Sequence, residues 1–320
     1  MTTIKTVAVL GATGNLGPAL VQALHDANFT VTAITRANSS NPTPSTFPSD
    51  VTVKSVDYTS PEALRAAFTG QDAVVSAVAT PALGIQIAAI DAAVAAGVKR
   101  FIPSEYGVDT RQAVGTTVGK ILAKKIEVTE YLQEVVKKGT APGFSWTGLS
   151  TGLFLDWGFD FNGLGVIDLK EKKATIIDSG NEKFYTSTLS HIGRSVAGIL
   201  LHPDETANKY LATASHNFSQ NELLAVVEEL TGSKFAVTHE KSEDLTRVGL
   251  EKLAAGEPIA FIYFLRTWNG TDGIGHGLTE EESDNALVGV PYEDTKAEVQ
   301  RWLERVGAGV STVNKRESYE

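Results

Sequence analysis

A glycine-rich turn that follows directly on an apolar segment near the N-terminus constrains this chain most. Residues 7–10 are the apolar run VAVL, residues 11–17 are GATGNLG, and a helix is predicted from there to about residue 27. Glycines here allow a tight turn, close approach of the backbone to a pyrophosphate, and close packing of helix on strand. The N-terminus of the helix offers free N–H groups to phosphates. Because a strand precedes the turn and a helix follows it, a dinucleotide site is favoured over a purely structural turn.

The rest of the first half alternates strands with helices. Such alternation predicts right-handed crossovers and a doubly wound parallel sheet of the Rossmann type, hence an α/β fold. The alternation of strands and helices becomes less regular after residue 152. The shorter strands and helices there predict a smaller α+β lobe. We therefore predict a dinucleotide-binding domain over residues 1–155 and a substrate-binding lobe over 156–320, with some elements around 184–215 returning to the first domain. Predicted strands of the first half are 7–10, 30–35, 51–56, 73–77, 100–102 and 144–149.

The spacing of the turn and the end of the second strand indicate the cofactor. The spacing is G-x-x-G-x-x-G, which points to the short-chain reductases, and the second strand ends in Thr35-Arg36 with no acidic residue before Asp50. The guanidinium group of an arginine suits a ribose 2′-phosphate, so NADP(H) is favoured over NAD. The alternative is that Arg36 is a solvated side chain at the start of a loop. Asp57 would either face the adenine or cap the following turn. The cofactor residues expected from this part of the chain are Gly11, Thr13, Gly14, Asn15, Leu16, Gly17, Arg36, Asp57, Ser76, Ala77 and Val78.

The tyrosine–lysine pair of typical short-chain dehydrogenases is missing from its expected place. The one Tyr-x-x-x-Lys match, Tyr292 to Lys296, lies near the C-terminus, far from the helices that flank the sheet. In the helix predicted over residues 118–138, Lys125 falls in the middle of the apolar stripe, at about 100° per residue. A lysine there either snorkels to the surface or places a partly desolvated amine, with a lowered pKa, at the cofactor cleft.

Three segments together resemble the isoflavone reductase-like and NmrA-like group of atypical short-chain reductases. They are the turn at 11–17, the string GVKRFIPSEYG at 97–107, and STGLF at 150–154 behind the lysine helix. The resemblance implies NADPH-dependent reduction of small aromatic or phenylpropanoid-like compounds, with Lys125 as the catalytic residue. Gly152 departs from the group, since its plant members commonly have Asn there, so a different substrate pocket is expected. The resemblance also assigns Gln86, Pro103, Ser104, Glu105, Tyr106, Lys125 and Phe154 to the surroundings of the cofactor.

The expected reaction transfers hydride to an enone, quinone, imine or carbonyl, while Lys125 donates a proton or stabilises negative charge. Aromatic residues of the second lobe would either build an apolar substrate pocket or form the core of that lobe. The expected substrate contacts are Tyr106, Phe154, Trp157, Tyr263, Trp268 and His276, the last of these in a glycine-rich loop predicted at 269–277.

Composition limits the alternatives. The chain has no cysteine, a net charge of −10 and no long apolar run, so we expect a cytoplasmic protein without a metal site, nucleic-acid partner or membrane span. The competing hypothesis is a non-catalytic NADP(H) sensor of the NmrA type that binds a protein partner, against which Lys125 argues. A sugar-nucleotide epimerase is disfavoured because the tyrosine–lysine pair is missing.

Overall fold

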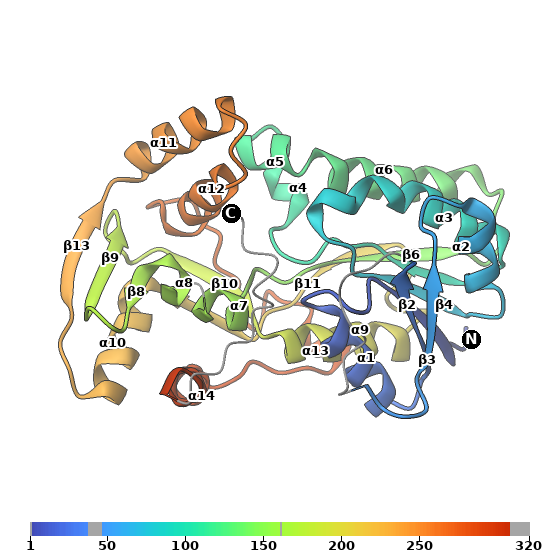
Figure 1. Cartoon of the computed structure of the whole chain (residues 1–320), viewed down its shortest axis with the longest axis horizontal. Coiled ribbons are helices and arrows are strands. Elements are labelled where there is room, and N and C mark those ends of the chain that lie inside the picture. Colours follow the sequence, from blue (N-terminus) through green and yellow to red (C-terminus); the bar gives the residue numbers. More distant parts are fainter. Residues whose placement is uncertain (1, 38–46, 161, 308–320) are drawn as a thin grey trace.

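The fold is described by a computed structural model that covers residues 2–37, 47–160 and 162–307 (Figure 1). Its centre is a seven-stranded sheet in which all neighbouring strands run parallel, in the order β11-β6-β5-β4-β1-β2-β3. The order reverses between β1 and β4, which makes the carboxyl ends of these two strands the place where such folds bind ligands. The strands are β1 (Thr6–Leu10), β2 (Thr30–Arg36), β3 (Thr52–Val56), β4 (Ala73–Ser76), β5 (Arg100–Ile102), β6 (Ser145–Ser150) and β11 (Lys209–Ala212).

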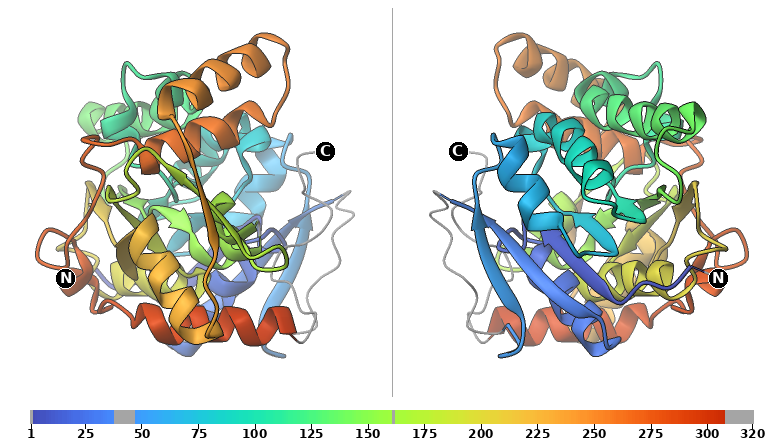
Figure 2. Two further views of the ribbon diagram at one scale, coloured as in Figure 1. Left: turned by 90° about the vertical axis from the view of Figure 1, so that its left-hand side faces the viewer. Right: turned by 90° about the vertical axis from the view of Figure 1, so that its right-hand side faces the viewer.

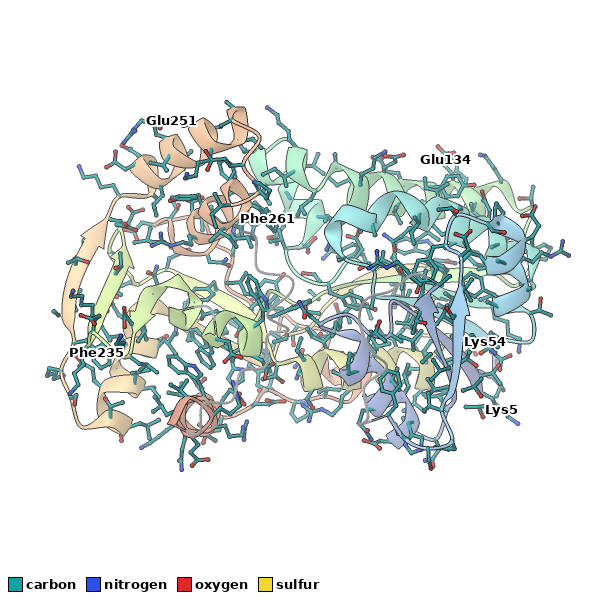
Figure 3. All side chains as sticks on the ribbon, viewed as in Figure 1. Lys5, Lys54, Glu134, Phe235, Glu251 and Phe261 are labelled. Atoms are coloured by element: carbon teal, nitrogen blue, oxygen red, sulfur yellow. The ribbon has the colours of Figure 1, made fainter. Side chains whose placement is uncertain are left out.

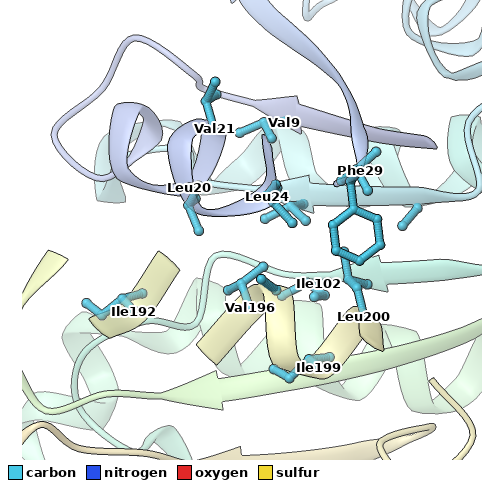
Figure 4. Close-up of a cluster of buried hydrophobic side chains, with 14 of the residues drawn as sticks. Val9, Leu20, Val21, Leu24, Phe29, Ile102, Ile192, Val196, Ile199 and Leu200 are labelled. Carbon is cyan, nitrogen blue, oxygen red and sulfur yellow. The ribbon is translucent and has the colours of Figure 1, made fainter. Parts of the chain in front are cut away.

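Both faces of this sheet are covered by helices, as the run of apolar residues in β1 requires. Val7 and Val9 point into a core shared with α1 (Gly17–Asp26) and α9 (Leu189–Leu201), part of which is shown in Figure 4. Ala8 and Leu10, which alternate with them, point into the opposite core. Helices α2 (Pro61–Phe68), α3 (Gln86–Ala95) and α6 (Ala123–Lys138) cover that side. The predicted doubly wound sheet is confirmed.

The second lobe holds two three-stranded sheets. One has the order β12-β10-β7 and the other β13-β9-β8. Figure 2 shows α11 and α12 together at one end of the molecule, on the side of α5. The strands are β7 (Leu153–Phe154), β8 (Ile167–Asp168), β9 (Lys173–Ile177), β10 (Lys183–Ser187), β12 (His216–Ser219) and β13 (Ala236–Glu240); the helices are α7 (Leu155–Asp160), α8 (Asn162–Val166), α10 (Gln220–Thr231), α11 (Ser242–Ala254), α12 (Ala260–Gly270), α13 (Asn285–Val288) and α14 (Thr295–Gly307).

Two elements that lie between β10 and β12 in the sequence, α9 and β11, return to the first domain. β11 forms an edge of the large sheet and α9 packs on α1, whereas β10 stays in a small sheet. The core of the second lobe includes Phe159 stacked on Trp302, with ring centroids 4.6 Å apart. Across the described part of the chain, no helix has the length and apolar character needed to cross a bilayer.

The helix predicted over residues 118–138 is divided at Leu122. It forms α5 (Thr117–Ile121) and α6, while a short α4 (Thr110–Ala113) and the 3-10 helix η1 (Thr80–Ile85) complete the first domain. α5 lies close against the turn before it, because Gly119 approaches Ala113 so nearly that a Cβ would lie 2.0 Å from the carbonyl oxygen. The divided helix still presents the predicted stripe: Lys125, Val128, Thr129 and Leu132 are the buried residues of α6. Glu134, on the other face, extends outward (Figure 3).

Candidate active site

The glycine turn is built so that two of its glycines have no room for a side chain. Gly11 has a φ of +82°, and a Cβ there would lie 2.6 Å from the carbonyl oxygen of Ala77. At Gly17 a Cβ would lie 2.3 Å from the carbonyl oxygen of Ala12. The turn therefore lies close against the end of β4, at the point where the strand order reverses.

The start of α1 suits an anion. Leu16 precedes the helix, no side chain caps it, and no acidic residue lies in its first turn. Backbone N–H groups at an uncapped helix start attract phosphate. Thr13, Gly14 and Asn15 belong to this turn, and Arg36 ends β2 at the same edge of the sheet with its side chain exposed.

Tyr58 braces the turn, which the sequence analysis did not anticipate. Its buried hydroxyl donates to the carbonyl oxygen of Ile34 at 2.8 Å and accepts from the N–H of Gly11 at 3.1 Å. Burial raises the pKa of Tyr58 to about 12, so the hydroxyl remains protonated. Its neighbour Asp57 accepts from the hydroxyl and N–H of Thr59 at 2.7 and 2.9 Å, which lowers the pKa of Asp57. These contacts match the interpretation in which Asp57 caps the turn that follows it, rather than facing the adenine.

The loop after β5 is tied to the loop after β4. Gln86 begins α3, and its Oε1 accepts from the N–H of Ser104 at 2.8 Å, while the Ser104 hydroxyl donates to the carbonyl oxygen of Val78 at 2.8 Å. Pro103 ends the strand just before this contact. Three buried polar atoms of this region, the Ser76 hydroxyl, Gln86 Nε2 and the Tyr106 hydroxyl, have no hydrogen-bond partner among the described residues. Such atoms fit a site that a polar ligand completes.

Lys125 is buried beside this loop, with 7% of the residue exposed. Its Nζ donates to the carbonyl oxygens of Glu105 and Tyr106, at 3.0 and 2.8 Å. Burial lowers the pKa of the amine, and the nearby Glu105 carboxylate partly opposes that effect. The snorkelling interpretation is therefore wrong: the amine lies inside the protein, at the carboxyl end of β5.

A buried carboxylate lies next to the lysine. Glu105 is fully buried, and its Oε2 accepts from the hydroxyls of Thr110 and Tyr210 at 2.6 and 2.8 Å. Tyr210 belongs to the edge strand β11 and packs under Arg111, with the guanidinium carbon 4.5 Å from the ring centroid. Neither Thr110 nor Tyr210 was predicted: Tyr210 lies 105 positions from Glu105, beyond any local pattern, and Thr110, five positions away, belongs to no motif.

An apolar cavity lies in the second lobe, next to β7 and α12. Phe154 and Trp157 line it, as predicted. Tyr106, Tyr263, Trp268 and His276 are not among the described residues that line it. Its described lining is Leu153, Phe154, Trp157, Gly158, Leu164, Gly165, Val166, Ile177, Phe184, Gln220, Ile262, Leu265, Arg266, Asn269 and Gly270.

The predicted loop at 269–277 is partly helical. Asn269 and Gly270 are the last residues of α12, because Asn269 turns its amide back to the carbonyl oxygen of Leu265 at 2.7 Å. Beyond the helix, His276 stacks on Trp268 with centroids 3.8 Å apart, and its Nδ1 lies 2.7 Å from the Trp268 carbonyl oxygen. Burial lowers the pKa of His276. Among the described residues, no group of three or more His, Asp or Glu could hold a metal ion.

A Rossmann sheet with a glycine turn at its switch point is the arrangement of dinucleotide-binding folds, and a buried lysine lies at the carboxyl edge of this sheet. The NmrA-like family model matches residues 3–273. The chain belongs to the NmrA-like family, and it is an oxidoreductase, as its curated relatives are.

Two relatives and one solved structure illustrate the similarity. Oxidoreductase aprR of Aspergillus flavus is 38% identical over 296 residues, which cover 91% of this chain and 96% of the relative. Isoflavone reductase homolog P3 of Arabidopsis thaliana is 30% identical over 251 residues, covering 75% and 79% of the two chains. The structure of AtPrR2 with NADP⁺ and (+)pinoresinol has a TM-score of 0.75 at 20% identity, covering 94% of this chain and 99% of that one. These matches confirm the predicted isoflavone reductase-like and NmrA-like grouping.

Proposed function

We propose that this oxidoreductase uses NADPH to reduce a small aromatic or conjugated acceptor, with Lys125 as proton donor or charge stabiliser. The observation that carries the proposal is the position of the Lys125 amine, buried at the carboxyl edge of the sheet and held by the loop that follows β5. A buried amine with a lowered pKa beside a nucleotide turn is suited to general acid catalysis.

The residues of the first domain fit NADP(H). The backbone of the turn at 11–17 and the start of α1 would hold the pyrophosphate, and Arg36 would pair with the 2′-phosphate. Ser76, Ala77, Val78, Gln86, Pro103, Ser104, Glu105 and Tyr106 would surround the nicotinamide end, with Phe154 beside the ring. When bound, the reduced nicotinamide supplies hydride to a polarised carbon of the acceptor.

Lys125 completes the reduction. Two of its three N–H groups donate to backbone carbonyls, which fix the position of Nζ and leave one N–H for the acceptor. As hydride reaches one atom of the acceptor double bond, the ammonium either stabilises the negative charge on the other or transfers a proton to it. A proton from solvent then restores the ammonium. Because burial already destabilises the charged amine, proton release from it is facilitated.

The cavity next to Phe154 is the proposed substrate site. Its lining is mainly apolar and aromatic, which is the usual character of small-molecule sites. Residues 1–155 would thus bind the cofactor and 156–320 would supply most of the substrate contacts.

The test is a screen of enones, quinones, imines and aryl aldehydes for consumption of NADPH. Reduction of at least one class, lost in a Lys125→Ala protein that still binds NADPH, supports the proposal. No consumption with any acceptor, together with tight binding of a protein partner, would instead support an NADP(H) sensor.

A further inference from the structure

Gln220 is a buried amide in the apolar cavity that the proposed reaction does not use. Only 2% of the residue is exposed, and it lines the cavity among the side chains of Phe154, Trp157 and Phe184. It is the first residue of α10, directly after β12. An amide is an expensive group to bury among apolar side chains unless its hydrogen bonds are satisfied.

The orientation of the amide is fixed by its one identified partner. Gln220 Oε1 accepts from the backbone N–H of Ile177 at 3.0 Å, in a buried setting. A backbone N–H can only donate, so the oxygen must be the atom that faces Ile177, and the NH₂ group must be elsewhere. Nε2 is buried and has no hydrogen-bond partner among the described residues. Gln220 therefore places an oriented donor in the cavity wall, with no acceptor among the described residues.

The surrounding backbone holds Gln220 in place. Ser219 and Glu222 form a reciprocal capping box around the start of α10, with contacts of 2.8 and 3.2 Å. Asn221 is tied to the turn after β9, since its N–H donates to the carbonyl oxygen of Gly180 at 3.1 Å. A donor fixed in this way is preorganised for a ligand.

The absence of a side chain at Gly270 leaves the room that the amide needs. A Cβ at Gly270 would lie 2.7 Å from Gln220 Nε2 and 3.0 Å from the Ile177 side chain. The second amide of the cavity, Asn269, differs because its Nδ2 already donates to the carbonyl oxygen of Leu265 at 2.7 Å. Arg266 also presents a buried Nε–H without a partner among the described residues, but its guanidinium is paired with Glu240 at 2.7 Å.

We propose that Gln220 determines specificity: its unpaired amide N–H donates to a neutral carbonyl or ether oxygen on the ligand, so that the cavity selects flat apolar molecules with such an acceptor. This inference rests on the proposed function, because it treats the cavity as the substrate site. A charged group would be costly in so apolar a lining, which is why a neutral oxygen is expected.

A pair of ligands of the same shape tests the donor without any need for turnover. Acetylnaphthalene carries a carbonyl oxygen, and isopropenylnaphthalene, substituted at the same ring position, has a CH₂ group in its place. Binding of each to the NADP⁺-saturated protein is measured by equilibrium dialysis. One hydrogen bond to a preorganised donor should make the ketone bind about tenfold more tightly.

Two variants of Gln220 and one control identify the source of that preference. Gln220→Met and Gln220→Leu both remove the amide donor, so both should reduce the ratio of dissociation constants to about one. Gln300→Met removes an exposed amide on α14, outside the cavity, and should preserve the tenfold ratio. Circular dichroism of each protein shows whether it is folded.

The inference is overturned if the wild-type protein binds the two ligands equally or binds neither. It is also overturned if both Gln220 variants retain the wild-type preference. Failure of the proposed reductase activity is a different result, visible only in the NADPH screen, because the dialysis measures binding alone.

Discussion

Two buried cations lie at opposite ends of the same part of the sheet, and their surroundings differ. Arg100 begins β5, with 1% of the residue exposed. Its guanidinium donates to the hydroxyls of Ser145, Thr147 and Thr206, each at 2.9 Å, and to the carbonyl oxygen of Pro203. Burial lowers the pKa of Arg100 to about 10. Each of its three nitrogens thus has a partner.

Lys125 lies beyond the carboxyl end of the same strand, with two carbonyl partners for three N–H groups. Burial of a cation therefore does not by itself indicate catalysis, since both side chains are buried. Arg100 joins β5, β6 and the segment before β11, so its role is structural. Lys125 keeps one N–H group without a partner among the described residues, at the carboxyl edge of the sheet. A proton donor in a reaction needs such a group.

The largest expected effect is on activity at Lys125. Lys125→Ala should lower kcat for NADPH oxidation by about 100-fold or more, the range for loss of a general acid. Its dissociation constant for NADPH should change by less than about twofold, because the turn and Arg36 carry most of the cofactor contacts. Steady-state kinetics and cofactor titration measure the two quantities. Full turnover by the variant would remove Lys125 from the mechanism.

Arg100 should show the opposite behaviour. Arg100→Leu leaves four oxygen acceptors without their donor, two of them buried, so the free energy of unfolding should fall by about 2–3 kcal/mol. Activity per folded molecule should stay within a factor of about two. Urea denaturation and an active-site count give both values. A selective loss of kcat in a stable protein would contradict the contrast between the two cations.

The pH dependence follows from the lowered pKa of Lys125. The ammonium is the active form in proton donation, so kcat should fall as pH rises through that pKa, at a pH below the ordinary 10.5 of lysine. A pH series of kcat measures this. In Lys125→Arg, whose side chain stays charged over this range, the remaining activity should not fall in the same interval. An identical alkaline fall in that variant would assign it to another group.

A smaller effect is expected at the cofactor end. Arg36→Ala should raise the dissociation constant for NADPH about tenfold through loss of a charge-assisted pair with the 2′-phosphate. NADH, which lacks that phosphate, should bind with unchanged affinity. Fluorescence titration with both dinucleotides provides the comparison. Equal weakening of both would show that Arg36 does not contact the 2′-phosphate.

The smallest effect is expected at Tyr58. Tyr58→Phe removes the hydroxyl that links Gly11 to Ile34, at a cost of about 1 kcal/mol in unfolding free energy. Thermal unfolding with and without NADP⁺ tests this. No change in either state would mean that solvent replaces the hydroxyl without cost.

Local patterns in the sequence were sufficient to predict the sheet, the glycine turn and the place of Lys125 in an apolar stripe, but not whether its amine is buried. Each depends on residues close together in the chain: alternating apolar segments, glycine spacing and the apolar stripe of one helix. Contacts between distant segments could not be predicted in this way. Glu105 meets Tyr210 because β11 returns to the edge of the large sheet, and Gln220 meets Ile177 because the two small sheets lie together. Trp268 was assigned to the substrate because it is aromatic and His276 because it lies in a glycine-rich loop; the structure stacks the two rings on each other.

The most direct test of the central claim is a titration of the Lys125 amine itself. Carbon-13-labelled lysine in the NADP⁺-saturated protein reports the ionisation of each side chain by NMR, and Lys125→Met assigns the signal. Lys125 should lose its proton at a pH below the ordinary pKa of lysine. A signal that titrates at the ordinary value would place the amine in water and contradict its proposed role.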